Sequence, residues 1–460
     1  MASFDLVVRG GTVVTAGGRG RYDIGIRNGR IAQLGGEMTA GEELDAAGAY
    51  VLPGGIDLHV HLMTSAPQPD DPPGWVDDFH TGTAAALAGG ITTVGQMSFP
   101  DEDDGSVRAA VDRDLAAAQQ QAVSDFVLHP SAFLATTDTP AQLRSLAAEG
   151  HRSLKIVTIA LDHDPRPVIE AVRTAAQLDM LVYVHCEDGV LIEHVTDTLT
   201  ASGHGQLCHY PASRPDYTEA AAVERAIAIC EATGAAIVLV HLSSAAALDA
   251  ARRARRRGLP VFVETRPLYL HLTADVHAEP DGGKYVGMPP LRTAADRDAL
   301  WAGMADGSVH TVASDHAPWL LADKVDAALD LNTIRAGVAD LETMLPMIFD
   351  EGVRTGRISL EQFVALTSTN TARLNGMYPR KGTIAVGSDA DLLVLDPERT
   401  WTIDGVRMQS RAGYSVYDGM NVTGAVRYTV SRGDVVYGDG AVLAEPGRGR
   451  LAVREGGGRL

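Results

Sequence analysis

Two histidines, His59 and His61, close an apolar run over residues 54–61 with a single residue between them. Side chains two positions apart on a β-strand point to the same face, so both imidazoles would be aimed at one point. Four more residues that can bind metals or carry protons end later apolar runs: Lys155, His185, His241 and Asp315. A lone histidine at a strand end is more often an ordinary hydrogen-bonded residue. Taken together, however, imidazoles and a carboxylate predict a site for zinc or a neighbouring first-row metal.

Lys155 is the least usual member of this set, because a lysine at a strand end ordinarily reaches solvent or pairs with an acid. Among metal ligands its ammonium group would be repelled. Loss of its proton and addition of carbon dioxide would instead give a carbamate, an anion whose two oxygens could bridge two metals. Spacing alone leaves both readings open. Cys186 and His316 directly follow candidate ligands and should face the other way, whereas Glu187 and Asp188 could orient ligands from a loop.

The elements that must position these residues alternate regularly. Eight apolar strand candidates cover residues 56–61, 92–95, 126–130, 153–158, 181–185, 237–241, 261–265 and 311–315. Helical stretches, among them 109–121, 168–178, 220–232 and 245–257, separate them. This order predicts an α/β fold, a (β/α)8 TIM barrel, with a doubly wound open sheet as the alternative. The candidate ligands favour the barrel, because only a closed barrel brings the ends of runs one, four, five, six and eight to one mouth.

Short alternating strand patterns punctuated by glycine pairs occupy the first fifty residues, and a similar pattern returns over residues 390–437. We therefore predict that both chain termini build one β-sandwich domain, residues 1–52 with 383–460. Residues 53–382 would form the metal-dependent catalytic barrel.

The amino-acid composition limits the kinds of partner that the protein can have. Lys plus Arg number 39 against 59 Asp plus Glu, a formal charge of 39 − 59 = −20, which argues against nucleic acid. The one basic run, residues 252–257, precedes Gly258 and is typical of a helix end. Three cysteines, an odd number, and no charged-then-apolar leader before Leu6 lead us to expect a cytoplasmic protein. No apolar stretch is long enough to cross a bilayer, so we expect no membrane partner.

Several ordered motifs extend this reading over nearly the whole chain. The sequence resembles the cyclic amidohydrolases of the amidohydrolase superfamily, most closely the dihydropyrimidinase and D-hydantoinase branch. The matching stretches are Pro53-Gly54-Gly55-Ile56-Asp57, Asp77-Asp78-Phe79-His80-Thr81-Gly82-Thr83, Pro289-Pro290-Leu291-Arg292, Ser314-Asp315-His316-Ala317-Pro318, and residues 284–286, 366–370, 378–387 and 445–450.

The resemblance implies two divalent metal ions, expected to be zinc. One would be held by His59, His61 and Asp315, the other by His185 and His241. Lys155, carboxylated to N6-carboxylysine, would bridge them. It further implies hydrolysis of a small cyclic amide such as a dihydropyrimidine or hydantoin. Hydroxide formed at the metals would attack the ring carbonyl, and Asp315 would carry the proton to the departing ring nitrogen. A homotetramer is implied as well, with residues 437–460 expected to assist assembly.

The expected substrate contacts depart from the family. Ala160, Met288 and Ala336 stand where this branch usually has Tyr, Ser and Asn, and Met63 follows the His-x-His segment where dihydroorotases usually carry an arginine. We expect these four residues at the substrate site. Loss of one oxyanion donor costs about 10² to 10³ in rate. We therefore hypothesise a ring that is bulkier or less polar than dihydrouracil.

This hypothesis requires other side chains to donate hydrogen bonds to the substrate, and loops over the barrel mouth to contact it. The candidate donors are Thr158, Gln96, His163 and Arg335. The loops expected over the barrel mouth are 63–75, 96–101 and 158–164. An allantoinase and a cyclic imide or lactam hydrolase remain alternative activities. A non-catalytic scaffold related to dihydropyrimidinases is a further alternative, but such scaffolds lack the metal ligands that this chain retains.

Overall fold

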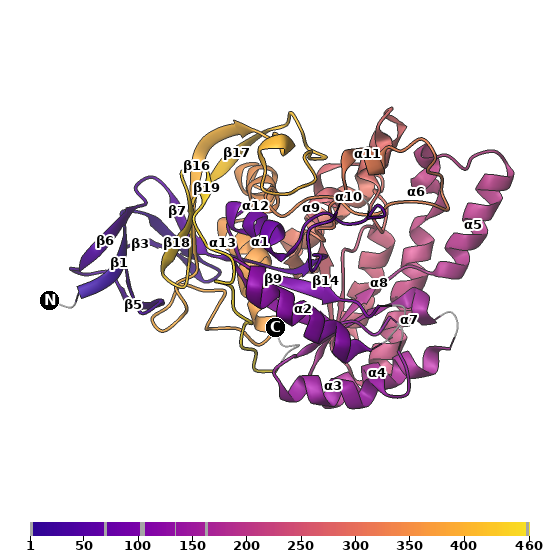
Figure 1. Cartoon of the computed structure of the whole chain (residues 1–460), viewed down its shortest axis with the longest axis horizontal. Helices are drawn as coiled ribbons and strands as arrows, with labels where there is room; N and C mark the ends of the chain where they lie inside the picture. The colour runs from indigo at the N-terminus through magenta and orange to yellow at the C-terminus, as the bar shows by residue number, and fades with distance from the viewer. Residues whose placement is uncertain (1–2, 69–70, 102–105, 134, 162–163, 457–459) are drawn as a thin grey trace.

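The computed structural model describes the 460-residue chain except residues 1–2, 69–70, 102–105, 134, 162–163 and 457–459. Figure 1 shows two parts side by side, a small all-β unit that holds the N-terminus and a larger unit in which helices surround a group of strands.

The larger unit is the predicted (β/α)8 barrel. Its parallel strands are β8 (Gly55–Val60), β9 (Ile91–Ser98), β10 (Asp125–Pro130), β11 (Ser153–Val157), β12 (Leu181–His185), β13 (Ile237–Leu239), β14 (Val261–Thr265) and β15 (Thr311–Val312). They pair in chain order within two sheets, β8 to β10 and β11 to β15. Parallel bridges between Ser131 and Lys155 and between Val60 and His316 join these sheets at both seams. The strands therefore form a closed ring, as the distribution of candidate ligands predicted.

Helices cover the outside of the ring. They include α1 (Phe79–Ala88), α2 (Val107–Gln121), α3 (Thr139–Ala148), α4 (Pro165–Gln177), α5 (Gly189–Ala201), α7 (Asp216–Thr233), α8 (Ala245–Arg256) and α10 (Ala294–Asp306). All six residues of β8 are buried, as expected of a strand with helices on one face and a packed barrel on the other. The helices bury mainly Ala, Val and Leu against the strands, forming one continuous core.

Two strands end earlier than the sequence predicts. Strand β13 stops at Leu239 and β15 at Val312, so His241 and Asp315 lie just beyond regular pairing. Both residues have positive φ angles, 39° and 51°, which L-amino acids rarely adopt and which do not continue a strand. Non-glycine residues persist in this region only where the surrounding structure holds them, and such residues cluster at functional sites.

The second unit combines both ends of the chain in two sheets. One has the order β5-β4-β1-β6 and the other β19-β18-β17-β16-β7-β2-β3. The N-terminal strands are β1 (Ser3–Arg9), β2 (Thr12–Thr15), β3 (Gly18–Arg21), β4 (Ile24–Arg27), β5 (Arg30–Leu34), β6 (Thr39–Asp45) and β7 (Tyr50–Pro53), and the C-terminal ones are β16 (Leu392–Thr402), β17 (Asn421–Ser431), β18 (Asp434–Gly438) and β19 (Ala441–Val442). Strand β7 pairs antiparallel with β16, with Leu52 opposite Leu393. Strands from the two termini thus share one sheet.

The last described segment returns to the barrel. The carbonyl of Arg450 accepts from the Phe126 N–H, and the Ala452 N–H donates to the Phe126 carbonyl, so this segment runs along β10. The exact limits of the two domains, 52/53 and 382/383, stay predictions.

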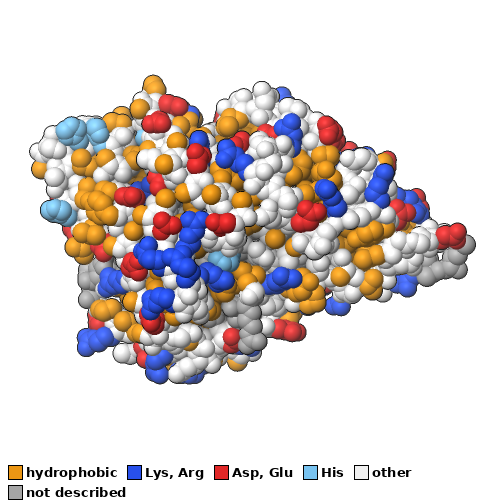
Figure 2. All heavy atoms as spheres, turned by 180° about the vertical axis from the view of Figure 1, so that it is seen from behind, with side chains coloured by type: hydrophobic (Ala, Val, Ile, Leu, Met, Phe, Trp, Pro, Cys, Tyr) orange, Lys and Arg blue, Asp and Glu red, His pale blue; other side chains and the backbone are white. Residues whose placement is uncertain are grey.

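The basic run ends a helix, as predicted. Helix α8 stops at Arg256, and Gly258 adopts a φ of 82°. Arginines of the basic run pair with acids on neighbouring elements: Arg252 with Asp306, Arg253 with Glu224 and Arg257 with Glu231. On the face of the molecule in Figure 2, basic side chains likewise have acidic ones beside them. No helix in the described part of the chain is long and apolar enough to cross a membrane.

Candidate metal centre

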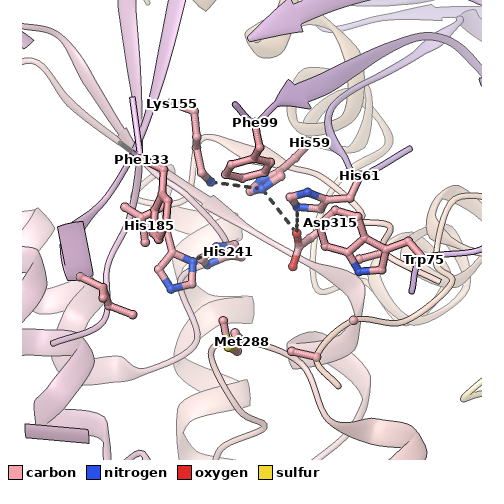
Figure 3. A pocket seen from close by; sticks show the side chains of 15 residues that line it. His59, His61, Trp75, Phe99, Phe133, Lys155, His185, His241, Met288 and Asp315 are labelled. Carbon is pink, nitrogen blue, oxygen red and sulfur yellow. Dashed lines mark hydrogen bonds and ion pairs between the residues drawn. The ribbon is translucent and has the colours of Figure 1, made fainter. Parts of the chain in front are cut away.

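A cavity of about 400 Å³ opens at the carboxyl ends of the barrel strands. The six predicted ligands all line it: His59, His61, Lys155, His185, His241 and Asp315. Figure 3 shows their polar ends turned toward a common centre, although they come from five different strand ends. The barrel therefore brings together residues that are up to 256 positions apart in the sequence (His59 to Asp315).

His59, His61 and Asp315 form a compact group. The Oδ1 atom of Asp315 lies 3.1 Å from Nε2 of His61 and 3.4 Å from Nε2 of His59. One ligand atom from each residue lies within 4.8 Å of the others. The two imidazoles share a direction, as their spacing predicted, with ring centroids 5.5 Å apart.

The other three residues lie beside this group. Nζ of Lys155 is 3.3 Å from Nε2 of His59, the nitrogen that also approaches Asp315. Nδ1 of His185 and Nε2 of His241 face each other at 2.9 Å. The whole Lys155 residue is only 2% exposed, so its amine has almost no contact with bulk water.

Burial sets the charge states of these groups. It lowers the pKa values of His59, His61 and His241, so their imidazoles are neutral near pH 7, the form that binds metals. Burial also lowers the pKa of Lys155 to about 8, although Asp315 and Glu264 partly offset the effect. For Asp315, burial alone would raise the pKa, but the Arg266 guanidinium and nearby histidines hold it well below its usual value of 3.8.

These residues fit a divalent cation. Neutral imidazole nitrogens and an ionised carboxylate oxygen converge from different elements, which is the donor chemistry of zinc and its first-row neighbours. His59, His61 and Asp315 together offer three ligand atoms close enough to hold one ion.

Several supporting residues were not predicted from the sequence. Oε1 of Glu264 lies 2.8 Å from Nδ1 of His59, which directs the opposite ring nitrogen, Nε2, toward the cavity. Asp57 accepts the N–H groups of His59 and Ser314 and so ties β8 to the segment before Asp315. Glu264 and Arg266 alternate at the end of the seventh strand, a period-two pattern that could have indicated both.

The residues that follow His185 in the chain make different contacts. Oε2 of Glu187 lies 3.0 Å from Nε2 of His185, in line with the orienting role suggested for it. Glu187 itself is held by Arg214 at 3.0 Å. Asp188 instead caps helix α5 by accepting the Leu191 N–H. Cys186 is buried, and Nε2 of His316 lies 2.9 Å from Asp77 instead of facing the cavity.

The remaining cavity wall is apolar. Trp75, Phe99 and Ile159 each come from one of the three loops predicted to cover the mouth, and Phe133 and Val157 join them. Figure 3 shows Trp75 and Phe99 close to His61. The ring centroid of His61 lies 4.7 Å from that of Trp75 and 5.8 Å from that of Phe99.

Of the four predicted substrate contacts, two line the cavity, one does not, and one has a side chain outside the described part of the structure. Met288 and Ala336 line the cavity. Met63 is not among its lining residues; its backbone N–H is bonded to Asp77, and 38% of the residue is exposed. The side chain of Ala160 lies outside the described part of the structure, as does His163.

The proposed replacement donors have other partners. Gln96 forms hydrogen bonds with the backbone of Leu62, and Thr158 donates to the carbonyls of His185 and Glu187. Arg335 bonds to Asp323. None of these three residues lines the cavity. Among the described residues that do line it, the side chains with nitrogen or oxygen atoms are those of the six candidate ligands and Trp75.

Comparison with known proteins agrees with this architecture. The Amidohydrolase family model matches residues 50–436. A D-hydantoinase from Rhizobium radiobacter is 37% identical over 458 residues, covering 98% of this chain and 99% of that protein. A D-phenylhydantoinase from Escherichia coli is 34% identical over 457 residues and 98% of each chain.

Among solved structures, a dihydropyrimidinase from Brevibacillus agri superposes with a TM-score of 0.91 at 35% identity, covering 99% of both chains. Both the sequence relatives and this structure extend over nearly the full length of the chain. The chain belongs to the amidohydrolase family.

Proposed function

We propose that this protein is a metal-dependent hydrolase that opens the amide bond of a dihydropyrimidine-like or hydantoin-like ring. One observation carries the proposal: six ligand-type side chains from five strand ends converge on one cavity at the barrel mouth. The full-length similarity to D-hydantoinases and a dihydropyrimidinase supports the reaction class.

The proposed cofactor is a pair of zinc ions. His59, His61 and Asp315 would hold one, and His185 and His241 the other, with carboxylated Lys155 between them. When bound, such ions would polarise the ring carbonyl and make a water molecule acidic enough to attack it near neutral pH.

The protein's own residues would position and move the proton. Asp315 would accept the proton of the attacking water and deliver it to the ring nitrogen, because an amide nitrogen leaves poorly unless protonated. Glu264 would hold the His59 ring through Nδ1, and Glu187 would hold the His185 ring through Nε2. The apolar wall would exclude bulk water from the reacting carbonyl.

Carboxylation of Lys155 is supported by the position of its amine. Nζ is buried and lies next to Nε2 of His59, where a cation would be unfavourable beside metal ions. Protein incubated with ¹³C-bicarbonate and zinc should show a carbamate carbon signal in its NMR spectrum. Lys155→Met should lack that signal, and its persistence in this variant would place the carbamate elsewhere.

The cavity favours a ring with an apolar substituent. The aromatic side chains of the wall, together with Met288 and Ala336, offer dispersion contacts but few hydrogen bonds. We propose that 5-aryl or bulky alkyl rings are turned over more efficiently than dihydrouracil.

Steady-state kinetics with dihydrouracil, unsubstituted hydantoin, 5-phenylhydantoin, succinimide and allantoin would test both proposals. The predicted order places 5-phenylhydantoin above hydantoin and dihydrouracil in kcat/KM. Efficient opening of dihydrouracil with no gain for larger rings would contradict the substrate preference, and inertness of the metal-loaded protein toward every ring would contradict the activity.

We also retain a homotetrameric assembly and a cytoplasmic location as proposals. The first is supported by the family resemblance and the second by three unpaired cysteines. Sedimentation of the purified protein would test the assembly.

A further inference from the structure

Arg266 is a fully buried cation next to the candidate metal centre, although it does not line the cavity. It follows strand β14 directly and precedes the short helix α9 (Pro267–His271). Burying a guanidinium is costly unless its charge is paired and its N–H groups are hydrogen-bonded. Arg266 has two acidic partners, Asp315 and Asp340.

The two contacts are unequal. Nη1 of Arg266 lies 2.6 Å from Oδ2 of Asp315, whereas Nη2 lies 3.3 Å from Oδ2 of Asp340. The first contact is slightly shorter than charge-assisted N–H···O hydrogen bonds usually are, and the second is longer than they usually are. The dominant partner of Arg266 is therefore the carboxylate of the candidate metal ligand.

The two oxygens of Asp315 consequently face different groups. Oδ2 accepts from Arg266, while Oδ1 faces the Nε2 atoms of His61 and His59 at 3.1 and 3.4 Å. The two oxygens are chemically equivalent, so a half-turn of the carboxylate would restore this arrangement. A partial turn would break the contact with the guanidinium and move the other oxygen away from the histidines. The planar guanidinium, itself fixed by burial and by Asp340, thus constrains the plane of the carboxylate and the position of the oxygen that faces the histidines.

We propose that Arg266 is a positioning residue that orients Asp315 so that Oδ1 completes the cation site with His59 and His61. The alternative is that Arg266 only neutralises two buried carboxylates. The metal-binding part of this proposal rests on geometry alone, and its catalytic part rests on the proposed hydrolase function. Partners that orient metal ligands typically contribute roughly 10- to 100-fold to metal affinity or activity.

A charge-balanced comparison separates the two roles. Asp340→Asn removes the remote acid but keeps an oxygen that can accept from Nη2. The double variant Arg266→Met with Asp340→Asn also removes the guanidinium, and it leaves one buried carboxylate, Asp315, for the metals to pair. Cobalt would be the probe, because its visible absorption reports coordination geometry, with bound metal per chain counted by elemental analysis.

The double variant keeps the net charge that Arg266, Asp315 and Asp340 have in wild type, and Asp340→Asn alone shows the effect of losing the remote acid. The double variant should bind cobalt roughly 10- to 100-fold more weakly than wild type, with an altered absorption spectrum and a lower kcat at similar KM. Equal affinity, spectrum and kcat in the double variant and wild type would overturn the proposal and leave Arg266 as a charge-balancing residue. If the double variant does not fold, Arg266→Lys decides the question. A changed cobalt spectrum in that variant supports positioning, and a wild-type spectrum contradicts it.

The readouts also separate this proposal from the proposed function. If wild-type protein opens no ring but its cobalt site responds to loss of Arg266, the hydrolase proposal fails and the positioning role stands. If wild-type and double-variant proteins open rings equally well, only the positioning role fails.

Discussion

Asp315 makes a different contact with each of its carboxylate oxygens. Oδ1 approaches the histidines of the compact group, and Oδ2 accepts from Arg266. Its positive φ of 51° shows that the surrounding backbone also constrains it. The same side chain is therefore placed to bind a cation and, in the proposed reaction, to carry a proton.

Replacement of Asp315 by Asn tests the second task. The amide keeps the shape of the side chain but cannot accept a proton, so kcat should fall by roughly 10²- to 10⁴-fold with a smaller change in KM. Asp112→Asn, at an exposed position on helix α2, is the matched control and should retain wild-type rates. Near-normal turnover by Asp315→Asn would remove the proton-transfer role from this residue.

At the scale of elements, the barrel mouth depends on strand ends and on the loops that follow them. Trp75, Phe99 and Ile159 come from loops after three different strands, and together they form much of the apolar wall. Met288 lies on the same cavity from another loop. Substrate preference is therefore expected to change with these loops while the ligands on the strand ends stay fixed.

Met288→Ser should shift preference toward small polar rings. A hydroxyl adds a hydrogen-bonding group, which contributes about 0.5–1.5 kcal/mol, while loss of the thioether removes apolar contact with a large substituent. The ratio of kcat/KM for 5-phenylhydantoin over dihydrouracil should fall about tenfold or more. Met420→Ser, at a half-exposed position outside the cavity, controls for the loss of a methionine. An unchanged ratio would show that Met288 does not contact the substituent.

The strands and ligands were more predictable than the wall. Alternation of apolar runs with Ala-rich stretches located all eight strands of the described barrel, and the His-x-His spacing correctly placed His59 and His61 together. Strand ends were less certain, because the positive φ angles of His241 and Asp315 are imposed by tertiary contacts. Which loop side chains turn inward also depends on tertiary packing. The sequence accordingly indicated the loops, but it did not single out Trp75 or Phe99.

Polar groups beyond the ligands were predicted least well. Glu264 and Arg266 touch the centre from the seventh strand, whose end carried no histidine to draw attention to it. Conversely, Gln96 and Thr158 have the right chemistry for substrate donors, but nearby backbone groups already engage them. Residue type indicates what a side chain can bind, and its competing local partners decide whether it is free to do so.

At the scale of the whole molecule, the barrel and the two-ended β-sandwich meet over a second cavity of about 570 Å³. Glu342 lines it together with residues of β16 and β17, and its Oε2 accepts the backbone N–H of Gln409 at 2.8 Å. Burial raises the pKa of Glu342 to about 7, and the nearby charge of Asp77 adds to the shift. This junction should therefore be sensitive to pH.

The sign of that sensitivity follows from proton binding. Between pH 4.5 and about 7 the folded protein keeps a proton on Glu342 that the unfolded chain has released. This contribution to stability is fully present below pH 4.5 and is lost as the pH rises through about 7. Glu342→Gln keeps an acceptor for Gln409 but cannot ionise, so it should gain stability relative to wild type at pH 8 compared with pH 5. Thermal unfolding midpoints at both pH values would show this, with exposed Glu398→Gln as the control.

A constant difference between Glu342→Gln and wild type at the two pH values would contradict the assignment. It would mean that Glu342 is ionised in the folded protein throughout this range, or that the junction opens enough to hydrate it.

The account as a whole depends on metal ions at the six-residue cluster. The most direct measurement is the rate of 5-phenylhydantoin opening by chelator-treated protein of known metal content, before and after addition of zinc and bicarbonate. We predict at least a 100-fold loss of rate on metal removal, in keeping with the several kcal/mol that metals supply in such sites, and recovery as the bound metal approaches two ions per chain. Undiminished ring opening by metal-free protein would contradict the central claim.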